Sequence, residues 1–264
     1  MQISQLYIYP VKSLAGILVE KAKVTDRGLK YDRRWVLVDE NNYHITQREM
    51  PELLAFVPTV LSHGIRITNT KNKDSILVPF WPLTEENVQI KVWDDVFEAT
   101  EVSAIISEWF SKSLDKKVRL MFQKDDSRRE IETKYAIKGD EIVSAADGYP
   151  ILIISEESLA DLNARLEEPV EMLRFRPNIV VKGIDAFEED KLGHLKIGLA
   201  EIIGVKNCGR CIMITNKPDG SPRGKEPLKT LSQYRLEGNK VLFGRNFLIS
   251  KQGEVEIGME VLPL

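Results

Sequence analysis

Short runs in which apolar and polar residues alternate occur along most of the chain, and they predict many short β-strands. The first run covers residues 3–11, where Pro10 should end the sheet pairing or place it at an edge. Residues 33–49 and 64–80 each predict a hairpin, because two β-rich runs flank a turn-forming stretch. Residues 88–102 predict two more strands around a pair of aspartates. The first half of the chain is therefore expected to consist mainly of β-structure.

The second half continues this pattern with strands that are more continuously apolar. Residues 151–154 and 175–183 predict buried strands, and alternation at 195–199 predicts another. The last stretch, 246–264, predicts a hairpin around Gly253. Many short strands with few helices indicate a β-barrel-like core with peripheral helices, a mainly β fold of the α+β kind.

Helical spacing of apolar residues is confined to a few segments. Residues 103–114 predict a helix with Ser103 as its N-cap, and 155–166 predict one that begins at Ser155. Two glutamates follow Ser155, and acidic side chains are favoured in the first turn of a helix. The apolar stripes of these two helices comprise Ile105, Ile106, Trp109, Phe110 and Leu114 in the first and Leu159, Leu162 and Leu166 in the second.

A third, short helix is predicted at 225–235, with Pro227 at its first helical position. The stretch 123–141 is polar and highly charged, and we expect it to be a loop that connects the two halves of the chain. The predicted domains are therefore 1–124 and 125–264.

Composition limits the classes of protein to which the chain can belong. Of its 264 residues, 43% are hydrophobic and 29% are charged, as in ordinary globular proteins, and the net charge of −3 argues against a nucleic-acid partner. No run of about 18 apolar residues predicts a membrane span, and the N-terminus lacks the features of a signal peptide. Two cysteines cannot form a disulfide framework, so we expect a cytoplasmic protein without membrane contact.

Both cysteines lie in the stretch NCGRC, as Cys208 and Cys211. A CxxC pair can supply half of a structural zinc site, but such sites need four ligands. The chain has no second CxxC, and His44, His63 and His194 are scattered without paired spacing. A structural zinc site is therefore a weak hypothesis for the pair.

Three further roles for the cysteine pair remain open at the level of sequence. A thioredoxin-like redox role requires the motif at a helix N-terminus, whereas the β-branched run 212–215 predicts a strand after Cys211. Two buried apolar fillers would suit a core, but Asn207, Gly209 and Arg210 are polar or small. Arg210 beside Cys211 would favour the thiolate, a soft ligand that suits copper, iron–sulfur or molybdenum centres.

Basic residues in the first half of the chain could form an anion pocket. Lys12 and Ser13 follow a strand that ends at a proline, where an ammonium, a hydroxyl and backbone N–H groups can bind phosphate. Arg33 and Arg34 are expected on consecutive strand residues, so that they point to opposite faces and one of them can point inward. Arg48 lies on the returning strand of the same hairpin. The alternative is that all of these residues are solvated surface charges.

In the second half, Arg176 and Asn178 stand at the entrance to the apolar stretch 179–181, which suggests a polar site on a rigid element. The alternative for Arg176 is an ion pair with a carboxylate at the edge of a strand. The stretch 216–227 is rich in glycine and proline and predicts a turn at 218–220. Such loops often carry substrate contacts, although a plain connection has the same composition.

Seven segments occur in one order along nearly the whole chain, and together they are more specific than any one of them alone. They are YPVKSLAG, DRRWVLVDE, SEESLADLNARL, FRPNIVV, NCGRCIMIT, KEPLKTLSQYR and LFGRNF. In this order they resemble the MOSC proteins, which are named for the C-terminal domain of molybdenum-cofactor sulfurase, and in particular the mitochondrial amidoxime-reducing component and its bacterial relatives. The resemblance implies an N-terminal β-barrel-type domain packed with a MOSC β-barrel.

The resemblance also implies a molybdenum cofactor, in which a pyranopterin and one protein cysteine hold the metal. The matching cysteine is Cys211, which is thereby the expected metal ligand and catalytic residue. Gly209 and Asn246 stand where the relatives carry serine and tyrosine. The cofactor-binding residues that the resemblance implies are Lys12, Ser13, Arg33, Asp147, Gly148, Tyr149, Arg176, Asn178, Arg210 and Asn246.

The activity implied by the resemblance is the reduction of N-hydroxylated compounds, such as amidoximes and N-hydroxylated bases. No cysteine follows Cys211, so the resemblance implies no iron–sulfur cluster in this chain, and a separate reductase or ferredoxin-like protein would supply the electrons. One alternative is a molybdenum-cofactor carrier or a sulfur-handling protein without turnover of its own. The other alternative is a β-barrel binding module that holds no molybdenum.

Overall fold

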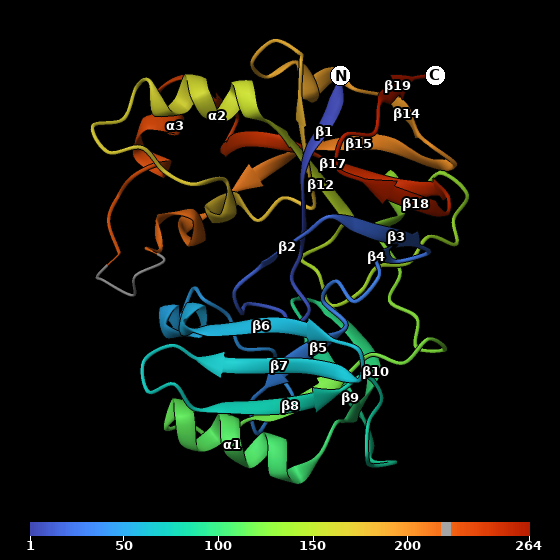
Figure 1. Ribbon diagram of the computed structural model, residues 1–264, viewed down its shortest axis with the longest axis vertical. Helices are drawn as coiled ribbons and strands as arrows, with labels where there is room; N and C mark the ends of the chain where they lie inside the picture. Colours follow the sequence, from blue (N-terminus) through green and yellow to red (C-terminus); the bar gives the residue numbers. More distant parts are fainter. Residues whose placement is uncertain (218–222) are drawn as a thin grey trace.

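The computed structural model describes residues 1–217 and 223–264, and the predicted turn at 218–220 lies outside them. The fold is mainly β with peripheral helices, as predicted, and its α-helices are α1 (Ala104–Leu114), α2 (Glu156–Asn163) and α3 (Leu228–Tyr234). Figure 1 shows two lobes, one that contains both termini with α2 and α3, and one that contains α1. Within the described residues, no helix has the length and apolar character needed to cross a membrane.

The lobe that contains the termini is built on one large sheet. Its strands, in the order in which they pair, are β19 (Val261–Pro263), β14 (His194–Ile197), β15 (Ala200–Arg210), β17 (Lys240–Lys251), β12 (Ile151–Ser155), β13 (Ile179–Lys182), β1 (Gln2–Ile8) and β2 (Ile17–Val19), and β16 (Leu236–Glu237) also pairs with β17. Neighbouring strands are antiparallel except β12 and β13, which are parallel. The start of the chain thus belongs to the same sheet as strands from the second half.

Three smaller sheets complete the fold of the described residues. They consist of β5 (Trp35–Val38), β11 (Arg119–Phe122), β10 (Asp95–Glu101) and β9 (Asn87–Val92); of β6 (Phe56–Leu61), β7 (Gly64–Asn69) and β8 (Ser75–Pro79); and of β18 (Gly253–Glu256), β3 (Lys21–Thr25) and β4 (Gly28–Leu29). The first two lie in the lobe that contains α1 (Figure 1). The 3₁₀ helices are η1 (Pro51–Ala55), η2 (Thr133–Tyr135), η3 (Met172–Phe175), η4 (Glu188–Lys191) and η5 (Ile212–Thr215).

Each lobe has its own apolar core. Leu6 and Phe247 belong to the core of the large sheet, while Phe56 and Phe110 belong to the core beneath α1. Burial of one such side chain stabilises the fold by about 1.5–3 kcal/mol. Ile105 was expected in the stripe of α1 but is 75% exposed, because successive helical residues point about 100° apart and Ile106 takes the inward position.

Of the three predicted hairpins, one is confirmed and two are not. β7 pairs with β8, as the run 64–80 predicts, and the two strands predicted in 88–102 are present as β9 and β10, which pair with each other. In the stretch 33–49, β5 pairs instead with β11, and the returning chain makes only an isolated bridge between Val38 and His44. The predicted hairpin at the C-terminus is wrong, because β18 pairs with β3. Alternation identifies a strand and its buried face, but it does not determine the partner strand.

Local predictions fail at three other places. Residues 212–215 form the 3₁₀ helix η5 with Cys211 as its N-cap residue, and not a strand. Arg33 lies in a turn with a left-handed φ of 49°, because the chain leaves the strand direction before β5 begins. Leu199 lies beyond the end of β14 and is 71% exposed.

The charged stretch 123–141 is irregular apart from the short η2, in agreement with the predicted connector. It is nevertheless anchored, because Arg129 and Ile131 are buried within it. The domain boundary near residue 125 stays a prediction.

The start of α2 is held by a buried polar cluster. Ser155 accepts a hydrogen bond from the Ser158 N–H at 3.0 Å, as expected of an N-cap, whereas Ser103 makes no such bond at the start of α1. The fully buried carboxylate of Glu189 accepts from the hydroxyls of Ser155 and Ser158 at 2.9 and 2.8 Å. Burial raises the pKa of Glu189 although these hydrogen bonds oppose the shift.

We expect the raised pKa of Glu189 to reduce stability as the pH rises. A carboxyl group whose pKa is higher in the folded state stabilises the fold fully below its unfolded pKa, and this contribution is lost as the pH rises through the folded pKa. Gln cannot ionise, so Glu189→Gln should not lose this contribution. Between the unfolded and the folded pKa of Glu189, the free energy of unfolding of the variant minus that of wild type should therefore increase by up to about 1.4 kcal/mol per pH unit. Urea unfolding across this pH window measures the difference, and two parallel curves would contradict the expectation.

Candidate functional site

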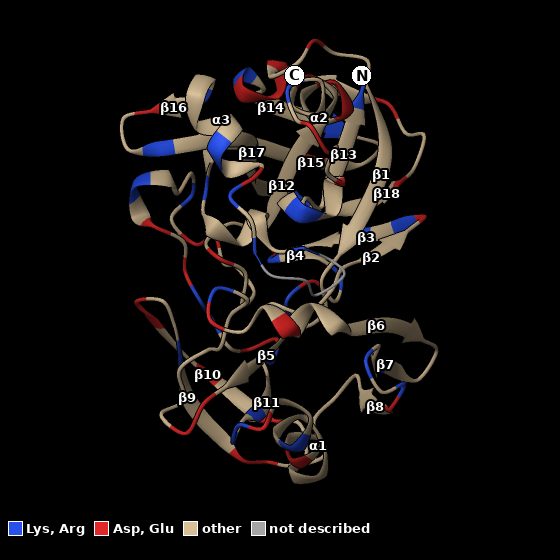
Figure 2. Ribbon diagram, turned by 90° about the vertical axis from the view of Figure 1, so that its left-hand side faces the viewer, with Lys and Arg blue, Asp and Glu red and all other residues tan. Residues whose placement is uncertain are grey.

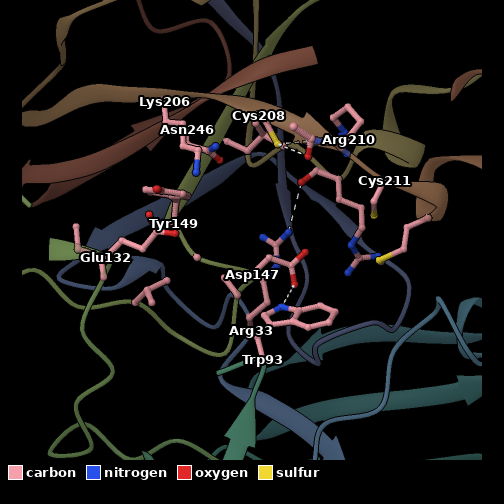
Figure 3. A pocket seen from close by; sticks show the side chains of 18 of the residues that line it. Arg33, Trp93, Glu132, Asp147, Tyr149, Lys206, Cys208, Arg210, Cys211 and Asn246 are labelled. Atoms are coloured by element: carbon pink, nitrogen blue, oxygen red, sulfur yellow. Dashed lines mark hydrogen bonds between the residues drawn. The ribbon is translucent and has the colours of Figure 1, made fainter. Parts of the chain in front are cut away.

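A cavity of about 710 Å³ is lined by residues from both lobes. Figure 3 shows labelled side chains that point into it from separate elements. In Figure 2, basic and acidic residues both occur along the loops where the lobes face each other. Arg34 does not line this cavity, whereas all eleven site residues that the resemblance implies do, namely Lys12, Ser13, Arg33, Asp147, Gly148, Tyr149, Arg176, Asn178, Arg210, Cys211 and Asn246.

Part of the cavity wall has an unusual backbone conformation. Ser13, Arg33, Trp93 and Arg176 all line the cavity, and all have a left-handed backbone with φ between 49° and 68°. Residues other than glycine rarely adopt this conformation, which costs of order 1–3 kcal/mol and is concentrated at functional sites. The surrounding structure holds it in place, as where the Arg33 N–H donates to the carbonyl of Tyr9. Five other non-glycine residues of the described chain have a left-handed backbone away from the cavity, so this conformation does not by itself mark the site.

Two guanidinium groups share one buried aromatic ring. The guanidinium carbons of Arg33 and Arg176 each lie 4.2 Å from the ring centre of Tyr9, which is fully buried. The Tyr9 hydroxyl donates to the carbonyl of Pro177 at 3.0 Å. Asp32 accepts from the Tyr9 N–H at 2.8 Å and from Arg33 at 2.6 Å. The ring and this carboxylate together offset the repulsion between the two cations.

Arg176 has no carboxylate partner among the described residues. Its Nη1 donates to the carbonyl of Leu14 at 2.9 Å, and burial, followed by the charge of Arg33, lowers its pKa to about 10. Asn178 is buried beside it, and its Oδ1 accepts from Arg33 and from the Leu152 N–H. Because a partly buried cation without an anionic partner is costly, an anion bound here would be stabilising.

Lys12 and Asp147 form an ion pair in the cavity. Their Nζ and Oδ1 atoms lie 2.6 Å apart, and the Lys12 side chain is 5% exposed while that of Asp147 is 64% exposed. The indole N–H of Trp93 donates to the same carboxylate oxygen at 3.3 Å. Burial lowers the pKa of Lys12 to about 8 although Asp147 raises it. Partial desolvation by the cavity wall would raise the pKa of Asp147, but the Lys12 ammonium and the Trp93 N–H hold it well below its usual range.

One face of β15 contributes every second side chain to the cavity wall. These residues are Lys206, Cys208 and Arg210 (Figure 3). Nη1 of Arg210 donates to the sulfur of Cys208 at 3.0 Å, and Nη2 donates to the carbonyl of Phe175 at 2.6 Å. The expectation that Arg210 acts on the neighbouring Cys211 is corrected accordingly, because its guanidinium bonds the other sulfur.

The two cysteines are too far apart for a disulfide. Cys208 lies within β15, and Cys211 continues the extended backbone with φ −129° and ψ −179°. Three extended residues separate two Cα atoms by about 10 Å, whereas a disulfide requires about 4.4–6.8 Å. The extended strand that precedes Cys211 therefore argues against a redox role for the pair. The sequence-based argument against that role, a strand after Cys211, does not hold, because η5 follows instead.

A metal at Cys211 would need ligands other than those that the described residues offer. In residues 1–217 and 223–264, no group of three or more His, Cys, Asp or Glu side chains is placed to hold a metal ion. The cavity does offer donors to an added group, because Nε of Arg210 and the hydroxyl of Tyr149 are buried without a hydrogen-bond partner in the described chain. A phosphorylated pyranopterin presents acceptors and negative charge. The residues present therefore fit such a cofactor.

Comparison with known proteins identifies relatives that match nearly the whole chain. Family models match residues 1–117, as the MOSC N-terminal beta barrel domain, and residues 140–262, as the MOSC domain. The chain belongs to the MOSC family. Mitochondrial amidoxime-reducing component 1 of Homo sapiens is 33% identical, over 99% of this chain and 82% of the relative. Mitochondrial amidoxime reducing component 2 of Rattus norvegicus is 34% identical, over 97% of this chain and 81% of the relative.

The cavity of this MOSC protein also contains residues that the sequence motifs do not identify. Trp93 bonds Asp147 from the turn between β9 and β10, and the Lys206 ammonium lies 5.6 Å from the ring centre of Tyr149. Arg129 reaches the cavity wall from the charged connector. The available signals are weak: a tryptophan at a turn, and Ile131 as an apolar residue within a charged stretch.

Tyr9→Leu should weaken the binding of a small anion such as pyrophosphate to the cofactor-free protein. Loss of the aromatic face removes what holds Arg33 and Arg176 together, and the affinity should fall about two- to thirty-fold. Tyr9→Phe keeps the ring and loses only the hydroxyl bond, so it should bind nearly as wild type. Titration calorimetry measures both variants, and equal affinities for Tyr9→Leu and Tyr9→Phe would show that the ring is not needed.

Proposed function

We propose that this chain is a molybdenum-cofactor-binding oxidoreductase that reduces N-hydroxylated compounds, such as amidoximes and N-hydroxylated bases, with electrons from a separate donor protein. The observation that carries the proposal is the convergence of Cys211 and ten other predicted residues, from segments far apart in sequence, on one cavity. The names of the curated relatives, which describe amidoxime reduction, support it.

In this proposal Cys211 is the protein ligand of the metal, and Lys12, Ser13, Arg33 and Arg176 hold the anionic end of the cofactor. The cofactor would supply a two-electron centre, at which an N–OH group, two protons and two electrons give an N–H group and water. The protein binds and orients the cofactor and compensates its charge. With a pKa of about 8, Lys12 is protonated at pH 7 and can act as a cation.

The charges in the cavity support an anionic cofactor. Nine basic and five acidic residues of the described chain line it, so that basic groups are in excess. Lys12 and Arg129 have carboxylate partners. Arg176 and Arg210 instead donate to backbone carbonyls and to a sulfur. A phosphate group can accept from such guanidinium groups in the paired geometry that arginine favours.

Replacement of Cys211 should remove the metal. We expect Cys211→Ala, produced in a host that synthesises the cofactor, to contain less than about a tenth of the molybdenum of wild type, because the variant lacks the thiolate that we propose as the protein ligand of the metal. Cys208→Ala is the matched control, since it removes the other thiol of the same strand end and should keep its molybdenum. Elemental analysis decides the assignment, and full metal content in Cys211→Ala would refute it.

Reduction of benzamidoxime with an artificial electron donor tests the activity itself. The molybdenum-loaded protein should convert benzamidoxime to benzamidine, and Cys211→Ala should not. Loaded protein that reduces neither an amidoxime nor an N-hydroxylated base would favour the cofactor carrier or the sulfur-handling protein. Wild-type protein that contains no molybdenum would favour the binding module.

A further inference from the structure

Arg129 is a buried arginine in the wall of the cavity, 3% exposed, within a stretch that otherwise forms an irregular connector. Its Nη1 donates to the carbonyls of Ser144, at 2.9 Å, and of Ala146, and its Nη2 reaches the carbonyl of Asp147 at 3.5 Å. On its other side, Nε and Nη2 lie 2.8 and 2.7 Å from the carboxylate of Asp95. One guanidinium group therefore joins two separate parts of the cavity wall.

The stretch 143–147 needs such a partner because it belongs to no helix or strand. Residues 143–146 are buried, so their backbone carbonyls cannot bond to water and require donors from the protein. Gln123 donates to the carbonyl of Val143, and Arg129 supplies the donors for the carbonyls of Ser144 and Ala146. Only arginine has several donors in one rigid plane, and a lysine at this position could not make the same set of bonds.

The stretch held by Arg129 ends at Asp147, whose carboxylate binds both Lys12 and Trp93. Trp93 lies in the turn between β9 and β10, and Asp95 is the first residue of β10, directly after that turn. Arg129 thus fixes the backbone of Asp147 against the turn whose tryptophan bonds the Asp147 side chain. A shift of this backbone by about 1 Å would break a 2.6 Å bond between Lys12 and Asp147.

We propose that Arg129 is a positioning residue of the cavity, which holds Asp147 where its carboxylate keeps Lys12 in place. The use of this arrangement for a molybdenum cofactor rests on the proposed function, whereas the arrangement itself does not. The role differs from that of a cofactor contact, because Arg129 acts through the backbone of Asp147.

The test measures the reactivity of Lys12 toward cyanate in the cofactor-free protein, as a function of pH. Cyanate carbamylates only the neutral amine, and peptide mass spectrometry quantifies the product at Lys12. In wild type the reaction should show a midpoint near the pKa of about 8. The charged groups that act on Lys12 are Asp147, Arg129 and Arg33, and the neighbouring His44 is neutral there because burial, followed by the charge of Lys12, lowers its pKa to about 4.

Arg129→Lys keeps the positive charge but loses the fork of donors, so any change reports the position of Asp147. We expect the midpoint of Lys12 to fall, with carbamylation at pH 7 about threefold faster or more, because the carboxylate that stabilises the ammonium has moved. Asp147→Asn removes the negative charge itself, so it should lower the midpoint of Lys12 by the largest amount. Arg34→Lys is the matched control, since Arg34 holds the carbonyl of Gln123 and the carboxylate of Asp125 but does not line the cavity. It should leave Lys12 as in wild type.

Asp95→Asn is a milder second variant, because it removes one partner of Arg129 and leaves the bonds to the carbonyls. Its midpoint should lie between those of wild type and Arg129→Lys. A wild-type midpoint in folded Arg129→Lys, or in Asp95→Asn if Arg129→Lys does not fold, overturns the proposal. An equal shift in Arg34→Lys overturns it as well, because the effect would then reflect general loosening. Since no metal is involved, none of these outcomes bears on the molybdenum content that tests the proposed function.

Discussion

The removal of several positive charges from water within one cavity is the constraint on which the rest of the site depends. Arg33 and Arg176 lie over the same ring of Tyr9, and Lys12 lies nearby with its side chain almost fully buried. Removing a charged group from water costs several kcal/mol unless a partner compensates it. The lowered pKa values of Lys12 and Arg176, about 8 and about 10, reflect this cost. The cavity therefore requires anions, whether from the protein or from a ligand.

The topology of the large sheet brings these charges together. In the antiparallel pairing of β1 with β13, Leu6 lies opposite Ile179. Tyr9 follows the end of β1 and Arg176 precedes the start of β13, so the pairing of these strands brings the two residues together although they are far apart in sequence. A slip of one residue in this pairing would turn every side chain of the strand to the other face. The site consequently depends on the long-range pairing that also forms the core of this lobe.

Much of the strand content and the helix that starts at Ser155 follow from alternation and capping, which are local properties of the sequence. The partners of β5 and β18 do not, because alternation is the same whichever strand lies alongside. The cofactor-binding residues could be named before the structure because the resemblance of the ordered segments to the MOSC proteins implies them. Arg129 could not be named in this way, because its role depends on hydrogen bonds to three backbone carbonyls of an irregular segment. No sequence pattern specifies where such carbonyls will point.

The spacing of the two cysteines shows why a motif requires its backbone conformation before it acquires a chemical meaning. In a turn, two cysteines separated by two residues can approach one metal or form one disulfide. In the extended end of β15 the same spacing separates them by about 10 Å, and the two sulfurs acquire different environments. Cys208 receives a hydrogen bond from Arg210, while Cys211 stands where the strand ends and η5 begins. The backbone therefore makes the two thiols inequivalent, and a single cysteine is all that a metal bound mainly by a cofactor would require from the protein.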